Sequence, residues 1–196
     1  MPQPAPLQYG KYYHIYNRGN NRENIFHETR NYRHFLNLYA KHVSPVVDTY
    51  AYCLLRNHFH FLVRIKDLEH LPEPLRSKKP SQQFSNLFNA YAKAFNRAYE
   101  RTGSLFQRPY SRIEIDSDAY FMQVVIYIHR NPQKHGFVHD FRTWPHSSYQ
   151  TILSTQPTRL QREEVLEWFQ GVEHFEEMHR YEVDESKIAP FIPQDT

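Results

Sequence analysis

The chain has 196 residues, 40% hydrophobic and 23% charged, which fits one globular domain with a small appendage. Its five glycines are too widely spaced for a glycine-rich phosphate-binding loop, and its single cysteine, Cys53, excludes disulfide frameworks and multi-cysteine metal sites. No apolar run approaches the roughly 18 residues of a membrane helix, and the N-terminus lacks the features of a signal peptide. We therefore expect a cytoplasmic protein without a membrane partner.

The net charge of +3 conceals a strong asymmetry along the chain. Residues 76–112 carry eight basic side chains and one acidic side chain, whereas residues 160–185 carry nine acidic and two basic ones. A basic segment attracts polyanions, so nucleic acid is one candidate partner for the middle of the chain. The alternative is that both segments are simply solvated helix surfaces, and charge alone does not decide between them.

The first half of the chain predicts three strands and one helix. Residues 11–17 read as a strand, and a helix opens at Thr29 or Asn31 with apolar side chains at helical spacing. Residues 46–55 and 57–65 predict two adjacent strands joined by a short turn. The proline-containing segment after Asp67 predicts a loop.

The second half predicts two longer helices around a short strand. Ser81 is a suitable N-cap for a long helix that we expect to end at Thr102–Gly103. Residues 112–115 read as a strand, and Asp116 or Ser117 caps a third helix. We expect Pro132 to stop that helix near Asn131.

The resulting order β-α-β-β-α-β-α predicts an α+β fold. Its two adjacent middle strands favour a ferredoxin-like (RRM-like) antiparallel sheet with helices packed on it. We expect this domain to span residues 1–150, followed by an acidic, mostly helical C-terminal extension over 151–196.

Two histidines stand two positions apart in residues 57–63 (NHFHFLV). On a strand, this spacing places His58 and His60 on one face, and Phe59 and Phe61 on the other. Two neighbouring imidazoles can share a metal ion, but histidines on a polar strand face are also common. The pair alone leaves both interpretations open.

Tyr127 and Asn131 are four positions apart and share one face of the third predicted helix. A tyrosine hydroxyl beside an amide could act as a nucleophile next to a metal ligand. The alternative is that Tyr127 belongs to the apolar core and that Asn131, which precedes a proline, only ends the helix.

Together these segments resemble a known family. The chain is similar to the single-tyrosine HUH transposases of the insertion-sequence 200/605 type, in particular the REP-associated tyrosine transposases (RAYT), over residues 9–150. Four segments carry the resemblance: YYHIYNRGN (12–20), LRNHFHFLV (55–63), RTGSLFQR (101–108) and YIHRNP (127–132). One departure is Leu55–Arg56, where relatives often have Met-Pro.

The resemblance implies a function and a site. His58, His60 and Asn131 would hold Mg²⁺ or Mn²⁺, and Tyr127 would attack a phosphodiester of hairpin-associated single-stranded DNA to form a 5′-phosphotyrosine. The protein would act as a monomer or a homodimer. The basic side chains expected to contact DNA are Arg18, Lys93, Arg97, Arg101, Arg108 and Arg112.

Other functions remain to be weighed. A domesticated protein that binds hairpin DNA without transposing would have the same site residues. An RNA-binding ferredoxin-like module is disfavoured because no RNP1-like aromatic strand motif is present, and a zinc deaminase because one cysteine cannot supply its ligands. The acidic extension is expected either to fold back onto the basic surface or to mediate dimerisation.

Overall fold

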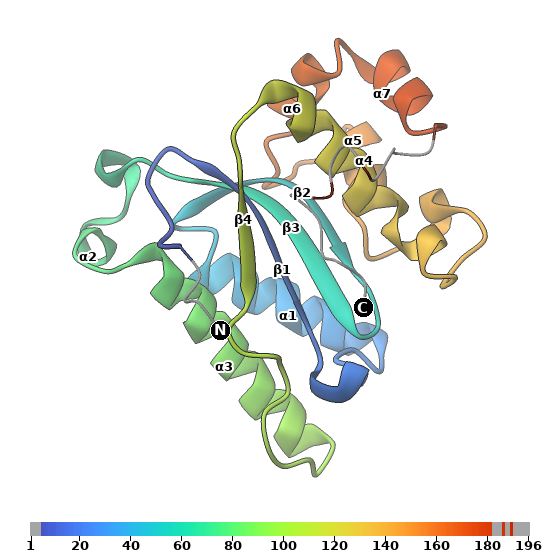
Figure 1. Cartoon of the computed structure of the whole chain (residues 1–196). Coiled ribbons are helices and arrows are strands. Elements are labelled where there is room, and N and C mark those ends of the chain that lie inside the picture. Colours follow the sequence, from blue (N-terminus) through green and yellow to red (C-terminus); the bar gives the residue numbers. More distant parts are fainter. Residues whose placement is uncertain (1–4, 182–185, 187–188, 190–196) are drawn as a thin grey trace.

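A computed structural model describes residues 5–181, 186 and 189, and it contains a four-stranded antiparallel sheet in the order β2–β3–β1–β4 (Figure 1). The strands are β1 (Tyr12–Arg18), β2 (Val47–Leu54), β3 (His58–Ile65) and β4 (Ser111–Ile115). The central strands β1 and β3 pair with each other, and each also pairs with one edge strand. This is the ferredoxin-like sheet that the sequence predicts.

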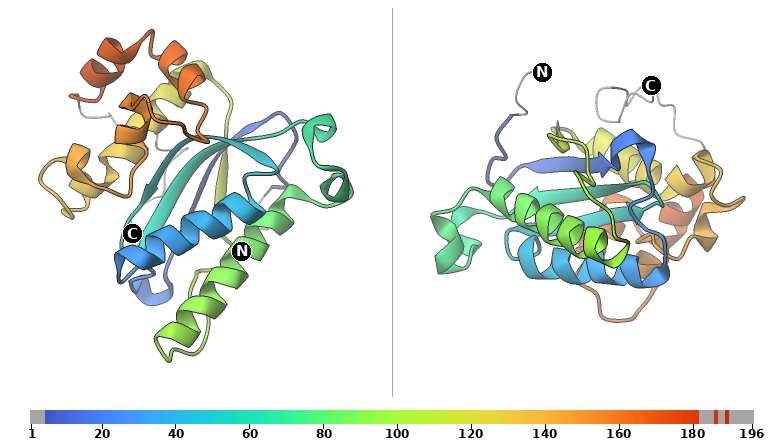
Figure 2. Two further views of the ribbon diagram at one scale, coloured as in Figure 1. Left: turned by 180° about the vertical axis from the view of Figure 1, so that it is seen from behind. Right: turned by 90° about the horizontal axis from the view of Figure 1, so that it is seen from below.

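Helices cover both faces of the sheet. They are α1 (Thr29–His42), α2 (Glu73–Arg76), α3 (Pro80–Ala98), α4 (Asp118–Lys134), α5 (Tyr149–Leu153), α6 (Arg162–Trp168) and α7 (Val172–Met178). Figures 1 and 2 show α1 and α3 on one face, and α4 with the C-terminal helices on the other. Among the described residues, none of the helices has the length and apolar character required to cross a membrane.

The alternation of side chains along β3 gives the two faces different chemistry. Phe59 and Phe61 point toward α1 and α3, where each ring packs against Phe35 at centroid distances of 5.2 and 6.3 Å. His58 and His60 lie on the opposite face, which α4 covers. The predicted separation of histidines from phenylalanines is confirmed.

Three predicted boundaries need correction. The helix that was expected to be capped by Ser81 begins at Pro80. Proline is tolerated in the first turn of a helix, because the N–H that it lacks would have no hydrogen-bond partner there. It ends at Ala98 rather than near Gly103, since Glu100 adopts a left-handed backbone (φ 50°). The third helix continues past Pro132 to Lys134, and the His135 N–H still donates to the Asn131 carbonyl at 3.0 Å.

The segment after Asp67 is not wholly loop. It contains a 3-10 turn at Leu68–His70 and the single-turn helix α2. These elements lie at the end of the molecule where α3 begins and do not alter the sheet.

The C-terminal extension packs against the face of the sheet that α4 covers. Val165, Phe169 and Phe175 are fully buried in the same hydrophobic cluster as α4, and the Gln161 N–H donates to the Thr49 carbonyl of β2 at 2.9 Å. Its described part therefore lies across the sheet from α3 and does not cover the basic side chains of that helix (Figure 1). Residues 182–185 of the acidic run lie outside the described residues.

Candidate active site

Side chains from β1, β3 and α4 meet in a small pocket beside the C-terminal end of β1. Strand pairing places Arg18 of β1 opposite His58 of β3. Helix α4 crosses this face and brings Tyr127 into the pocket, and Asn131 follows one helical turn later. The residues that line the pocket are Tyr16, Asn17, Arg18, His58, His60, Tyr127 and His135.

His58 is held between two amides. Its Nδ1 lies 2.7 Å from Asn57 Oδ1, and its Nε2 lies 3.1 Å from Asn131 Oδ1. If the Nδ1–H donates to Asn57, Nε2 carries only a lone pair. The lone pairs of His58 Nε2 and Asn131 Oδ1 then converge. The 3.1 Å between these two atoms is close to the distance of roughly 3 Å expected between adjacent ligand atoms that each lie about 2.1 Å from one cation.

His60 is fully buried, and its ring is oriented by a third histidine. His60 Nδ1 lies 2.9 Å from Nε2 of His14, which is itself fully buried on β1. His60 Nε2 is buried and makes no hydrogen bond. A buried nitrogen without a partner is rare, because it loses its bond to water without replacement. If His60 donates from Nδ1 to His14, its Nε2 carries a lone pair that a bound cation would satisfy.

The donor set favours a divalent cation held by neutral groups. Burial lowers the pKa of His60 well below its usual value, and the neighbouring His14, His58 and His135 lower it further, so the imidazole stays neutral near pH 7. No group of three or more His, Cys, Asp or Glu side chains suited to a metal ion occurs among the described residues. The Asn131 amide oxygen, 3.1 Å from His58 Nε2, could serve as a third ligand beside the two imidazoles.

Tyr127 lies beside the imidazoles. Its ring centroid is 5.7 Å from that of His60 and 6.0 Å from that of His14, and both pairs are close to edge-on. The ammonium of Lys134 lies 5.3 Å from the same ring centroid, in a cation–π arrangement. The Tyr127 side chain is only 3% exposed, so α4 holds the phenol in a defined position inside the pocket.

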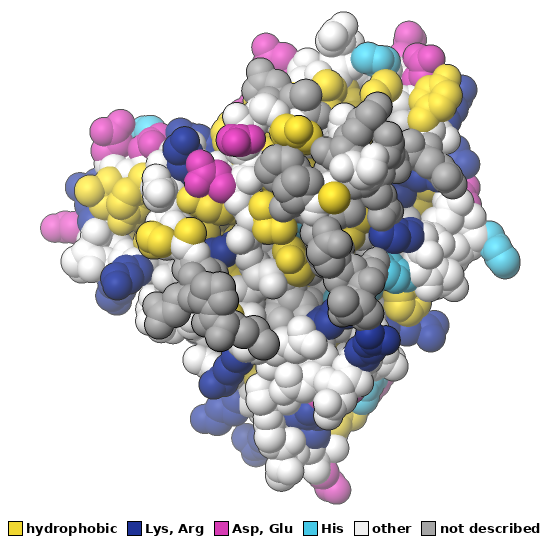
Figure 3. All heavy atoms as spheres, viewed as in Figure 1, with side chains coloured by type: hydrophobic (Ala, Val, Ile, Leu, Met, Phe, Trp, Pro, Cys, Tyr) yellow, Lys and Arg dark blue, Asp and Glu magenta, His cyan; other side chains and the backbone are white. Residues whose placement is uncertain are grey.

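The predicted DNA-contacting residues are divided between two regions. Arg18 lines the pocket, whereas Lys93 and Arg97 are exposed on α3 across the sheet. In Figure 3, acidic side chains lie along the upper edge and at the upper left of the molecule, and basic ones lie at the lower left over α3 and also on the right. Arg108 is exposed, and the guanidinium of Arg112 lies 5.2 Å from the centroid of the Tyr110 ring.

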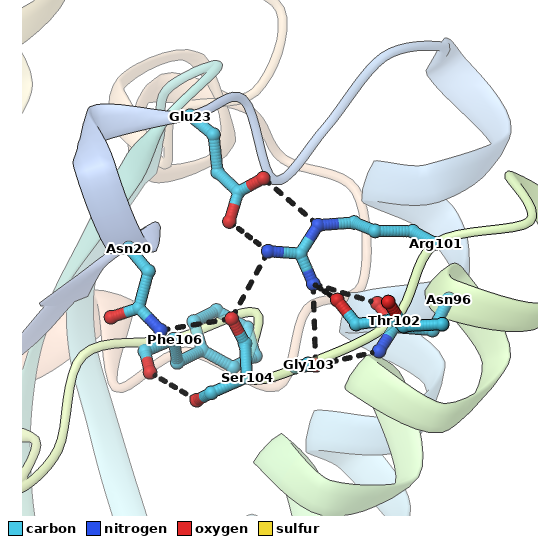
Figure 4. A network of polar contacts seen from close by, with 8 residues as sticks. All are labelled: Asn20, Glu23, Asn96, Arg101, Thr102, Gly103, Ser104 and Phe106. Atoms are coloured by element: carbon cyan, nitrogen blue, oxygen red, sulfur yellow. Dashed lines mark hydrogen bonds and ion pairs between the residues drawn. The ribbon is translucent and has the colours of Figure 1, made fainter.

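Arg101 holds a loop in place (Figure 4). Its Nε donates to Glu23 at 2.8 Å, and a second nitrogen donates to the other oxygen of that carboxylate. The remaining contacts are with the side chain of Asn96 and the carbonyls of residues 102–104. Since every nitrogen of the guanidinium already donates within the protein, we remove Arg101 from the proposed DNA contacts.

A second buried histidine cluster lies elsewhere on α4. His129 Nδ1 is 2.8 Å from His179 Nε2, and His129 Nε2 is 2.8 Å from Ser148 Oγ. His179 Nδ1 is 2.7 Å from the Phe175 carbonyl. Helical phase predicts that His129 points away from Tyr127, and this placement confirms that prediction.

Three site residues have no role assigned from the sequence, although it predicts that His14 and His135 could lie near the site. They are His14, which contacts His60; His135, whose ring centroid is 4.9 Å from that of His58; and Lys134, which lies over Tyr127. Spacing gives a partial signal, because Lys134 follows Tyr127 by seven residues and His135 follows Asn131 by four, and both intervals keep side chains on one helix face. The role of His14 depends on the pairing of β1 with β3.

Comparisons with known proteins show what the chain is similar to in sequence and in fold. No protein-family profile matches the chain. It is 28% identical over 104 residues to a candidate REP-associated tyrosine transposase of Haemophilus influenzae, a match that covers 52% of this chain and 58% of that relative. The fold matches that of a REP-associated tyrosine transposase solved with a REP hairpin, with a TM-score of 0.59, 20% identity, and coverage of 80% of this chain and 88% of the other. The chain is thus similar to REP-associated tyrosine transposases in sequence and in fold.

Proposed function

We propose that the protein cleaves and rejoins hairpin-associated single-stranded DNA through a tyrosine nucleophile. The observation that carries this proposal is the convergence of Tyr127, His58 and His60 in one pocket, with Asn131 Oδ1 lying 3.1 Å from His58 Nε2. The hairpin as substrate is supported by the solved relative, which is bound to a REP hairpin.

His58, His60 and Asn131 would hold a divalent cation, Mg²⁺ or Mn²⁺. Imidazole ligands favour Mn²⁺ over Mg²⁺. When bound, the cation supplies positive charge that polarises the scissile phosphate and stabilises the departing 3′ oxygen. The three protein ligands are neutral, so they leave that charge intact.

The phenol of Tyr127 supplies the nucleophile. Its Oη forms a bond to phosphorus as the bond from phosphorus to the 3′ oxygen breaks, and the phenolic proton passes to solvent. The products are a 5′-phosphotyrosine and a free 3′-OH. Attack by another 3′-OH reverses the step and joins new strands without ATP, because the phosphotyrosine retains a diester linkage. Helix α4 and strand β3 position the reacting groups.

A second candidate is a protein that binds hairpin DNA without cleaving it. The burial of Tyr127 favours this alternative, because a phenol that is 3% exposed must become accessible before it can reach a phosphate. The two functions differ in one product, the covalent protein–DNA adduct.

The adduct can be detected with purified protein, Mn²⁺ and 3′-labelled hairpin DNA that carries single-stranded flanks from beside its own gene. The attacking tyrosine stays attached to the labelled fragment, so we expect a labelled protein band on a denaturing gel. Tyr127→Phe should abolish the band. Tyr16→Phe is the matched control, since Tyr16 lines the same pocket, and it should retain the band.

Two other outcomes of this experiment would contradict the proposed function or the assignment of its nucleophile. DNA binding without an adduct on any flanking sequence would favour the binding-only protein. An adduct that survives in Tyr127→Phe would mean that another side chain is the nucleophile.

A further inference from the structure

Helix α4 does not stop at its proline, and its last residues extend the face that carries the site. Pro132 lacks an N–H donor, yet the helix continues to Lys134. Gly136 then adopts a left-handed backbone (φ 69°), and the Phe137 N–H donates to the Pro132 carbonyl at 2.9 Å. A left-handed glycine and such a hydrogen bond are typical of a helix C-terminus. The backbone that carries Lys134 is therefore held in place.

Lys134 lies on the same helix face as Tyr127. It follows Tyr127 by seven residues, which is about two helical turns. Its ammonium lies 5.3 Å from the centroid of the Tyr127 ring. A helix that ended at Asn131 would leave Lys134 outside the helix, without a fixed phase relative to Tyr127. The residues after the proline thus give the phenol a cationic neighbour.

The groups around Tyr127 differ in charge and in exposure. The rings of His14 and His60 are buried and contact Tyr127 close to edge-on. Burial lowers the pKa of His60 well below its usual value, so this imidazole is neutral near pH 7. Lys134 is exposed and reaches the buried phenol through its flexible four-carbon stem. It brings a positive charge to the nucleophile that the imidazoles do not supply.

The proposed reaction has a use for such a charge. A phosphodiester has two non-bridging oxygens, and both gain negative charge as Tyr127 Oη bonds to phosphorus. A bound metal cation can polarise one of them, and the other then needs a donor from the protein. Arg18 lies opposite His58 on the neighbouring strand, beside the proposed cation site, whereas Lys134 lies over the nucleophile. An ammonium offers three N–H donors to an oxygen there.

We propose that Lys134 is a further catalytic residue, whose ammonium donates to a non-bridging oxygen of the scissile phosphate. The inference rests on the proposed function, because the contact forms only when a phosphate reaches Tyr127. The bond from Oη to phosphorus forms and the bond to the 3′ oxygen breaks, while Lys134 keeps its proton and the phenolic proton passes to solvent. The contact persists in the 5′-phosphotyrosine.

The ammonium changes partners by side-chain rotation alone. A cation–π contact at an exposed site is weaker than a charge-assisted hydrogen bond to a phosphate. The ammonium of Lys134 therefore leaves the Tyr127 ring when a phosphate arrives. Because the helix backbone is already held, no other part of α4 has to move for this exchange.

The test compares Lys134→Met, which removes the charge, with Lys134→Arg, which keeps it. Lys41→Met is the matched control, because Lys41 is also exposed in the last turn of a helix, α1. The substrates are the 3′-labelled hairpin DNA and two versions in which one or the other non-bridging oxygen of the scissile phosphate is replaced by methyl. Single-turnover rates of adduct formation are measured with Mn²⁺, together with melting temperatures and the affinity for Mn²⁺.

On the ordinary phosphate, Lys134→Met should form the adduct about 10- to 100-fold more slowly than the wild type, as expected for loss of a hydrogen bond to a charged group. Lys134→Arg should retain most of the rate, and Lys41→Met all of it. With one of the two methylphosphonates, the ratio of wild-type to Lys134→Met rates should fall to about one, because the oxygen that Lys134 contacts is missing. Melting temperatures and Mn²⁺ affinities should be unchanged.

Each failure has its own signature. A wild type that forms the adduct through Tyr127, with Lys134→Met equally fast, would overturn the role of Lys134 and leave the proposed function intact. A slow Lys134→Met whose rate ratio stays the same with both methylphosphonates would mean that Lys134 only packs against the ring, which also overturns the inference. A wild type that forms no adduct would overturn the proposed function together with this inference.

Discussion

Two histidine clusters are buried against α4, and they differ in how their nitrogens are satisfied. In the cluster of His129, His179 and Ser148, every imidazole nitrogen lies within 2.8 Å of a protein partner. In the cluster of His14, His58 and His60, the Nε2 of His60 has no hydrogen bond, and the Nδ2 of the adjacent Asn131 also has none.

We infer from this difference that the first cluster has a structural role and the second a functional one. A fully paired polar network stabilises the packing around it, whereas a buried nitrogen without a partner weakens the fold unless it binds something. The first cluster joins the C-terminal extension to α4. The second lies beside Tyr127 and lines a pocket. Burial alone does not distinguish the two.

The largest expected effect comes from removing a ligand of the proposed cation site. His60→Ala should lower the rate of DNA cleavage by at least about 100-fold, since even loss of an outer-shell partner costs about 10- to 100-fold. Its melting temperature should also fall, because the substitution opens a cavity and removes the partner of His14 Nε2, so rates are compared at a temperature at which both proteins are folded. Initial rates with Mn²⁺ and thermal melts measure both effects. Cleavage at the wild-type rate would contradict the assignment of His60.

His14 is expected to act as a positioning residue. His14→Phe removes the partner of His60 Nδ1, so the affinity for Mn²⁺ should fall by about 10-fold or more. His14→Gln keeps a hydrogen-bonding group and should restore part of that affinity. Calorimetric titration with Mn²⁺ measures the change without DNA. Equal affinities in all three proteins would mean that His14 only fills space.

The structural cluster should affect stability and leave the chemistry intact. His179→Leu leaves His129 Nδ1 buried without its partner, so the free energy of unfolding should fall by about 1–3 kcal/mol. Urea denaturation measures this loss. His139→Leu changes an exposed histidine and serves as the control. A folded His179→Leu protein that has lost Mn²⁺ binding would erase the distinction between the clusters.

Lowering the pH should destabilise the protein through these buried imidazoles. Burial lowers the pKa of His179 to about 4 and that of His129 well below its usual value. Below about pH 6.5 the unfolded chain takes up these protons while the folded chain does not, so stability falls by about 1.4 kcal/mol per pH unit for each such group. Urea denaturation at about pH 7 and about pH 5 tests this. His179→Phe should have the shallower dependence, and an unchanged slope would count against the assignment.

The smallest effect is expected from the exposed cations of α3. Lys93→Ala with Arg97→Ala removes two side chains one turn apart, so hairpin affinity should fall several-fold at low salt. The slope of log affinity against log salt should flatten by about 1–2, the contribution of two phosphate contacts. Anisotropy titrations at several salt concentrations measure it. A slope equal to that of the wild type would exclude both residues from the DNA interface.

The sequence is a good guide where local periodicity determines the outcome. The two-residue period of His58 and His60 and the four-residue interval from Tyr127 to Asn131 correctly place these groups on shared faces. The order of strands and helices also predicts the ferredoxin-like sheet. All of these depend on residues that are close in the chain.

The sequence is a poor guide where the outcome depends on distant contacts. Charge cannot distinguish Arg101, which is bound to a carboxylate 78 residues away, from the exposed Arg97. The role of His14 needs the pairing of β1 with β3. Pro132 predicts that the helix stops near Asn131. The helix instead continues for two residues beyond the proline, because the loss of one N–H donor is tolerated so close to the end of a helix.

The most direct test of the central claim is calorimetric titration of Mn²⁺ into the wild type, His58→Ala and His179→Leu. The wild type and His179→Leu should each bind one ion with similar affinity, and His58→Ala should bind none. Binding that persists in His58→Ala, or a wild type that takes up no ion, would contradict the assignment of the cation site to His58, His60 and Asn131.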